Sequence, residues 1–249
     1  MGRKQDKSKS MNMNNTLQLD ITTQCNLKCF KCDRMCSQAP SEDRMSLEQV
    51  EFFINESKEF PWKRIEVMGG EPTVHPNFWE IIELLLHYQK NFNNQCELKI
   101  TTNGKMPIKD LIYLYRVLEN KIGIINTNKS SRIQTFNNIN VAPCDMESFR
   151  NSNFKIGCYR PESCGWGLSR IGYYPCGPGA AIDRVFGFNI GIKHLKDVNN
   201  ESLDKQKEIL CKVCGHFMGD NFTNINSVSE TWKKAFESYN QCPPVLDLY

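Results

Sequence analysis

Three cysteines near the N-terminus have the type and spacing of metal ligands. Cys25, Cys29 and Cys32 stand within eight residues, separated by three and then two residues, and Cys36 follows after three more. Structural zinc sites almost always have four protein ligands. A set of three therefore indicates a site with one open position, and we interpret Cys36 as an ordinary thiol outside the set.

An iron–sulfur cube held by three thiolates fits this pattern. One of its irons has no protein ligand and can chelate a small molecule through an amine and a carboxylate. A structural zinc site is the alternative interpretation, although zinc ligands commonly occur as two separated pairs. The open position therefore predicts a bound cosubstrate.

The composition of the chain favours a cytoplasmic protein that binds neither nucleic acid nor a membrane. The chain has 249 residues, 12 cysteines and a net charge of +3. Its N-terminus lacks the apolar region of a signal peptide, so we expect a disordered leader over residues 1–15 and a cytoplasmic protein, in which cysteines serve metals or catalysis. The weak charge and the absence of a basic run interleaved with aromatics argue against nucleic acid. No segment has membrane-spanning length.

Strands and helices are predicted to alternate along the first half of the chain. The expected strands are 17–21, 64–68, 98–102 and 122–125, and the expected helices are 47–57, 76–90 and 107–118, the first with a capping box at Ser46 and Gln49. This alternation is typical of a parallel α/β sheet, open or closed into a barrel. Residues 140–142 are a possible fifth strand.

The loops after these strands carry the chemical motifs. The cysteine loop follows the first strand, Gly69-Gly70-Glu71-Pro72 follows the second, and Thr101-Thr102-Asn103-Gly104 ends the third. In parallel α/β sheets, ligands bind at the carboxyl ends of the strands. The sequence therefore predicts that the three loops form one site.

Together these motifs resemble the radical S-adenosylmethionine (radical SAM) superfamily, over roughly residues 15–145. The resemblance implies a truncated TIM-like (β/α) barrel in which Cys25, Cys29 and Cys32 hold a [4Fe-4S] cluster that binds S-adenosylmethionine. It places Phe30 beside the adenine. The further cofactor-binding residues that it implies are Gly69, Gly70, Glu71 and Pro72 near the methionine amino group, and Thr102 and Asn103 near the ribose or carboxylate.

A second group of cysteines lies beyond residue 150, where glycines and aromatics become frequent. Its members are Cys158, Cys164, Cys176, Cys211 and Cys214. The last two form a Cys-x2-Cys pair, which presents two thiolates to one metal and is also frequent in zinc sites. The arrangement resembles the SPASM or Twitch appendage of radical SAM enzymes, which implies an auxiliary [4Fe-4S] cluster. We expect the ligands Cys164, Cys176, Cys211 and Cys214, with Cys158 as a rival to Cys164 or as a ligand itself.

These observations predict a core domain over residues 16–150 and an auxiliary-cluster domain over residues 151–249. The expected function is a radical SAM oxidoreductase that removes a hydrogen atom from its substrate and oxidises an alcohol carbon of a sugar or cyclitol-like small molecule. A flavodoxin or ferredoxin would donate electrons. The alternatives are a peptide-modifying maturase, an epimerase, and a non-catalytic zinc or iron–sulfur binding module. The sequence identifies no catalytic base.

Overall fold

The computed structural model describes residues 15–129, 139–219 and 227–249. The expected leader therefore lies almost entirely outside the described residues. The strands are β1 (Thr16–Asp20), β2 (Arg64–Met68), β3 (Glu97–Thr102), β4 (Gly123–Asn126), β5 (Trp166–Ser169) and β6 (Gly172–Tyr174). The helices are α1 (Leu47–Ser57), α2 (Phe78–Asn91), α3 (Ile108–Leu118), α4 (Arg160–Cys164), α5 (Gly177–Phe186), α6 (Asn200–Val213) and α7 (Glu230–Gln241).

Among the described residues, six strands form one sheet in the order β4-β3-β2-β1-β5-β6. Strands β1 to β5 pair with one another in parallel, and β6 pairs with β5 in the antiparallel direction. The sequence thus correctly predicts an α/β protein with a mainly parallel sheet. The partial-barrel form stays a prediction.

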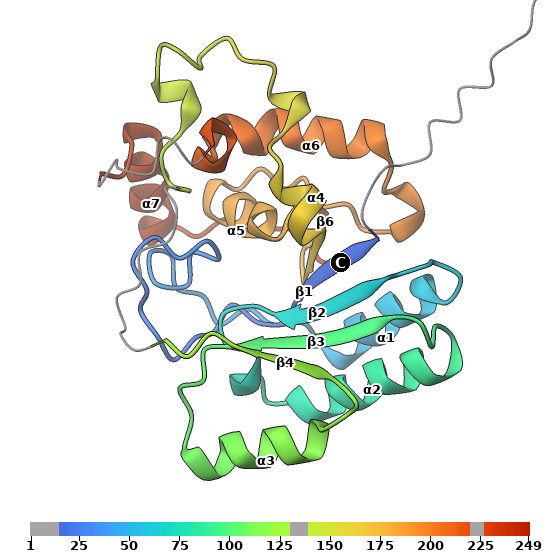
Figure 1. Ribbon diagram of the computed structural model, residues 1–249. Coiled ribbons are helices and arrows are strands. Elements are labelled where there is room, and N and C mark those ends of the chain that lie inside the picture. Colours follow the sequence, from blue (N-terminus) through green and yellow to red (C-terminus); the bar gives the residue numbers. More distant parts are fainter. Residues whose placement is uncertain (1–14, 130–138, 220–226) are drawn as a thin grey trace, which may run out of the picture.

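The sheet continues across residue 150. Strand β5 lies beside β1, with Leu17 opposite Trp166 and Asp20 opposite Ser169. Figure 1 shows α1, α2 and α3 below the sheet and the C-terminal helices above it. The C-terminal half therefore adds strands to the sheet of the N-terminal half, and the division at residue 150 remains a prediction.

Alternation along β1 separates the two faces of the sheet. Leu17 and Leu19 are fully buried in a core that includes side chains of α1, α2 and α3. Gln18 and Asp20 point to the opposite face, because successive strand residues alternate. A second apolar core joins α5, α6 and α7 to Met35 and Ala39 from the loop after β1. The polar face of β1 thus lies toward the C-terminal half.

Most predicted elements agree with the structure to within about two residues, and one does not. Ser46 and Gln49 form the predicted capping box of α1. Residues 140–142 are not a strand, however: they lie in a turn that leads into a short 3-10 helix, Pro143–Asp145. The apolar residues Ile139, Val141 and Ala142 are buried, but none of the strands in the described part of the chain pairs with them. Their burial in a loop produced the same pattern as a strand.

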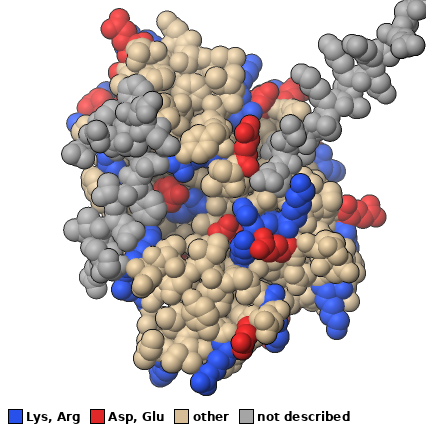
Figure 2. Space-filling view, in the orientation of Figure 1, with Lys and Arg blue, Asp and Glu red and all other residues tan. Residues whose placement is uncertain are grey.

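Among the described residues, no helix is long and apolar enough to cross a membrane. On the face of the molecule shown in Figure 2, basic and acidic side chains are interspersed.

Candidate functional site

The carboxyl ends of β1, β2 and β3 lie at one edge of the sheet, as the parallel pairing requires. Asp20 stands opposite Met68 in the register of the first two strands. In Figure 1 the loops that follow these strands leave the sheet on its left side. The cysteine loop and the two other motif-bearing loops therefore meet in space.

A cavity of about 270 Å³ lies between these loops. The predicted site residues that line it are Cys25, Cys29, Cys32, Gly69, Gly70, Thr102 and Asn103. Three segments that are far apart in sequence thus contribute to one space. Among the described residues, no group of three Cys, His, Asp or Glu side chains converges on a point as ligands of a single metal ion do.

The environment of the three cysteines affects their readiness to ionise. Burial raises the pKa of Cys25, and the nearby charges of Cys32, Glu71 and Cys29 raise it further. The pKa of Cys32 is instead lowered, to about 7, mainly because of a side-chain hydrogen bond with Cys36. Cysteine binds a metal as the thiolate. Cys36, which the sequence leaves outside the ligand set, therefore lies at the site: it lines the cavity and contacts Cys32.

Glu71 lies behind the cavity and connects two of its walls. Its carboxylate is buried and accepts hydrogen bonds from the Thr73 backbone and hydroxyl, from the Thr102 hydroxyl at 2.8 Å and from the Asn103 backbone at 2.7 Å. Neither Glu71 nor Pro72 lines the cavity. The described contacts of Glu71 join the turn after β2 to the end of β3, and its predicted contact with a methionine amino group stays a prediction.

Alanine at Glu71 should therefore destabilise the protein without removing any cavity-lining side chain. The change leaves buried donors of Thr102 and Asn103 without an acceptor, which costs about 2–4 kcal/mol of unfolding free energy. Urea denaturation of the metal-free protein measures this loss. Glu51→Ala, at an exposed position of α1, is the control and should change stability by less than about 0.5 kcal/mol. Equal stability of both variants would contradict this role.

Gly69 and Gly70 are required by the chain itself. A Cβ atom at Gly70 would stand 2.1 Å from the Gln24 carbonyl oxygen, and one at Gly69 would stand 2.2 Å from that of Thr22. Gly69 also has a φ of +137°, which other residues rarely adopt. These glycines therefore let the turn after β2 approach the loop that carries Cys25, in addition to lining the cavity.

Several cavity residues were not predicted from the sequence. Thr127 and Lys129 follow β4, and the Lys129 amine lies 3.8 Å from the Cys29 sulfur. Asp33 and Arg34 follow the third cysteine and also line the space. The only signal for them was their position after a strand or beside the motif. Phe30, predicted to lie beside the adenine, is 44% exposed and does not line the cavity.

The second group of cysteines is assembled by the C-terminal helices. Cys164 ends α4 and Cys176 is the N-cap of α5. Cys211 lies in the last turn of α6, and Cys214 is its C-cap. Cys158 lies in the loop before α4. Elements separated by more than fifty residues thus place these thiols in one region.

The buried thiols of the second group raise one another's pKa values. Burial raises the pKa of Cys176 to about 12, with smaller contributions from Cys158 and Cys164. Burial also raises the pKa values of Cys211 and Cys214, and Cys176 and Cys158 add to both shifts. The charges of Cys158 and Cys176 thus act on both members of the Cys211–Cys214 pair. The choice between Cys158 and Cys164 as the fourth ligand stays a prediction.

A known protein family matches the segment that contains the three cavity-forming loops. Residues 19–124 match the family model of the Radical SAM superfamily. The N-terminal part of this chain is a radical SAM domain. The matched segment runs from β1 to β4 and contains the three cavity-forming loops.

The curated relatives match the chain over a shorter segment. A probable GTP 3′,8-cyclase of Methanococcus maripaludis is 33% identical over 89 residues, which are 36% of this chain and 28% of that protein. A probable GTP 3′,8-cyclase of Pyrococcus horikoshii is 34% identical over 88 residues, 35% of this chain and 26% of that protein. The matches thus span little more than a quarter of these relatives.

A solved structure extends the likeness in fold to most of the chain. The crystal structure of BtrN in complex with AdoMet and 2-DOIA has a TM-score of 0.52 and 19% sequence identity, and the match covers 81% of this chain and 92% of BtrN. The radical SAM domain is therefore part of a larger shared α/β fold.

Proposed function

We propose that this protein is a radical SAM oxidoreductase that oxidises an alcohol carbon of a sugar or cyclitol-like small molecule. The observation that carries the proposal is the cavity in which Cys25, Cys29 and Cys32 face Gly69, Gly70, Thr102 and Asn103. Cys25, Cys29 and Cys32 would hold a [4Fe-4S] cluster, which with bound S-adenosylmethionine would supply a 5′-deoxyadenosyl radical for the removal of a hydrogen atom from carbon. The three thiols fit such a cluster, which leaves one iron free for the cosubstrate.

The residues of the chain hold and orient these groups. The Asn103 side-chain amide donates to Asn26 at 2.8 Å and lies 3.9 Å from the Cys25 sulfur, so it fixes the cysteine loop against the end of β3. The close packing of Gly70 on Gln24 fixes the same loop against the end of β2. The chain thus presents a rigid wall on which a cosubstrate is positioned, with Thr102 and Asn103 as its predicted polar partners.

An auxiliary [4Fe-4S] cluster on the second group of cysteines would account for oxidation. Four thiolates saturate such a cluster, so it can only transfer electrons or support the fold. A substrate radical beside a hydroxyl oxygen loses an electron readily, this cluster would accept that electron, and the hydroxyl proton would leave to solvent. The coupled thiols favour Cys158, Cys176, Cys211 and Cys214 as its ligands, with Cys164 as the alternative to Cys158. A cytoplasmic flavodoxin or ferredoxin would reduce the first cluster.

The shared fold with BtrN, solved with AdoMet and 2-DOIA, supports a small-molecule substrate. A second candidate is cyclisation of GTP, which the sequence likeness of the radical SAM domain to probable GTP 3′,8-cyclases favours. Peptide modification, epimerisation and a non-catalytic metal-binding role have no separate observation in their favour.

An anaerobic assay distinguishes the candidates. The protein, loaded with iron and sulfide, is incubated with S-adenosylmethionine and dithionite, together with either a panel of sugar and cyclitol alcohols or GTP. We expect one alcohol to yield a carbonyl product that lacks two hydrogen atoms, in a one-to-one ratio with 5′-deoxyadenosine, measured by mass spectrometry. Reactions without dithionite are the control.

Each other outcome has a defined meaning. Consumption of GTP instead of any alcohol would favour the cyclase candidate. Inversion of a stereocentre without loss of hydrogen would indicate an epimerase. No 5′-deoxyadenosine under any condition would contradict the radical SAM proposal.

A further inference from the structure

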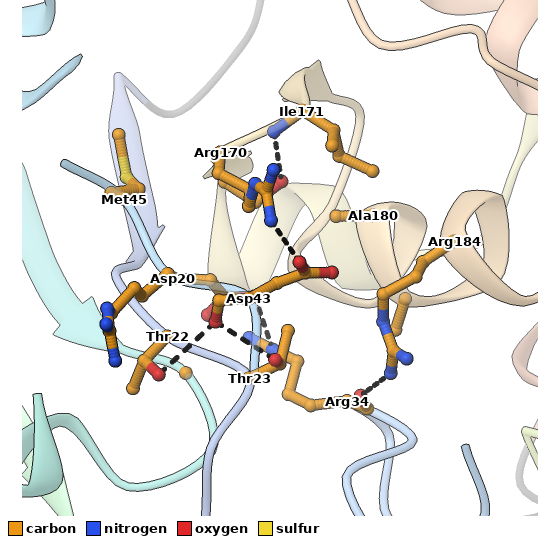
Figure 3. Close-up of a pocket in the computed structure, with 14 residues that line it drawn as sticks. Asp20, Thr22, Thr23, Arg34, Asp43, Met45, Arg170, Ile171, Ala180 and Arg184 are labelled. Atoms are coloured by element: carbon orange, nitrogen blue, oxygen red, sulfur yellow. Dashed lines mark hydrogen bonds and ion pairs between the residues drawn. The ribbon is translucent and has the colours of Figure 1, made fainter. Parts of the chain in front are cut away.

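Arg34 occupies a buried position between the two groups of cysteines. Its guanidinium bonds the Asp20 carboxylate at 2.8 Å, the Asp33 carboxylate at 3.1 Å and the Gln18 amide oxygen at 3.0 Å. The side chain is 8% exposed. Arg34 lines the cavity of the first three cysteines and also a second pocket, between the loop after β1 and α5, which Figure 3 shows. Arg34 therefore contributes to the walls of both the cysteine cavity and the second pocket.

Both the first and the last turn of helix α5 contact Arg34. At the start of the helix, a Cβ atom on Gly177 would stand 2.4 Å from the Arg34 guanidinium, so this guanidinium packs directly against the residue after Cys176. In the last turn, Arg184 donates to the Arg34 main-chain oxygen at 3.2 Å and to that of Ala39 at 2.6 Å. Figure 3 shows Arg184 pointing from α5 toward this loop. The helix that begins at a cysteine of the second group thus holds the loop of the first.

The charge of Arg34 acts on both groups of thiols. Burial alone would lower the pKa of Arg34, but the charges of Asp20, Asp33 and Cys32 raise it. Burial raises the pKa of Cys176, and Arg34 opposes this shift. The guanidinium is permanently protonated in proteins. A fixed positive charge therefore lies within electrostatic range of Cys32 on one side and Cys176 on the other.

We propose that Arg34 is a shared counter-charge for the two iron–sulfur clusters and sets their reduction potentials together. The inference rests on the proposed function, because it requires both clusters. Reduction adds one electron, and hence one negative charge, to a cluster. A nearby cation stabilises the reduced form, and net charge is one of the factors that set cluster potentials. Arg34 thus makes electron entry into each cluster more favourable, and α5 keeps it between them.

The test is a redox titration of each cluster by electron paramagnetic resonance. The first cluster is measured in a background with serine at Cys158, Cys176, Cys211 and Cys214, and the second in a background with alanine at Cys25, Cys29 and Cys32. Arg34→Gln should lower the equilibrium constant for reduction of each cluster at least tenfold. Both reduction potentials should therefore become more negative by at least about 59 mV, the equivalent of tenfold for one electron. Arg34→Lys keeps the positive charge, so both potentials should stay close to those of the unaltered protein.

Asp20→Asn provides a change of opposite sign. It removes a negative charge from the Arg34 pair, so both potentials should become less negative, which damage to the fold would not produce. This variant also keeps the test decisive if Arg34→Gln does not fold. Arg170→Gln is the matched control, since Arg170 lines the same second pocket but pairs with Asp43. It should leave both potentials unchanged.

Two results would overturn the inference. Unchanged potentials in Arg34→Gln and Asp20→Asn would show that the charge does not reach the clusters. A shift of the first cluster alone would show that Arg34 serves only its own loop. Failure of the unaltered protein to assemble either cluster would refute the proposed function instead, so the two failures are distinguishable.

Discussion

Alanine at Cys25, Cys29 and Cys32 together should abolish the formation of 5′-deoxyadenosine from S-adenosylmethionine under dithionite. These three cysteines line one cavity beside the glycine turn and the end of β3. Without them no cluster can bind there, and the cosubstrate loses the iron that would reduce it. Mass spectrometry of the anaerobic reaction measures the product, and we expect none above the background without protein.

Cys242→Ala is the matched control for this variant. Cys242 is the exposed cysteine at the end of α7, outside both groups of cysteines. Its replacement should leave both iron content and 5′-deoxyadenosine formation unchanged. Undiminished 5′-deoxyadenosine formation in the triple alanine variant would refute the assignment of the first cluster.

The same triple variant should still contain about four irons per chain, because the second group of cysteines is intact. Iron, sulfide and zinc analysis of anaerobically prepared protein measures this directly. Zinc without iron would indicate a structural zinc site, and the proposed alcohol oxidation would lose its main support. Absence of any bound metal would contradict a metal centre in the C-terminal half.

Single serine variants in this triple background identify the fourth ligand of the second cluster. Cys158 contributes to the raised pKa values of Cys176, Cys211 and Cys214, and Cys164 contributes to those of Cys158 and Cys176. We therefore expect Cys158→Ser to remove most of the remaining iron and Cys164→Ser to retain it. The reverse pattern would restore the ligand set that the sequence favours.

The sequence alone predicted the elements of the radical SAM domain. Leu17 and Leu19 alternate with polar residues, and Ser46 with Gln49 caps α1, so the local pattern determines these elements with little help from the rest of the chain. The positions of the motifs after β1, β2 and β3 then predicted a common site, because parallel strands end at the same edge. The family match over residues 19–124 confirms the radical SAM domain that this reasoning identified.

Only the tertiary structure decided how the two halves of the chain meet. The pairing of Trp166 with Leu17, and the contact of α5 with Arg34, join residues about 150 positions apart, and no local periodicity encodes such contacts. Local pattern also misled at residues 140–142, where buried apolar residues lie in a loop. Sequence spacing can place Cys25 with Cys32, because a short loop keeps them close. It cannot rank Cys158 against Cys164, because their distances to Cys211 depend on how separate helices pack.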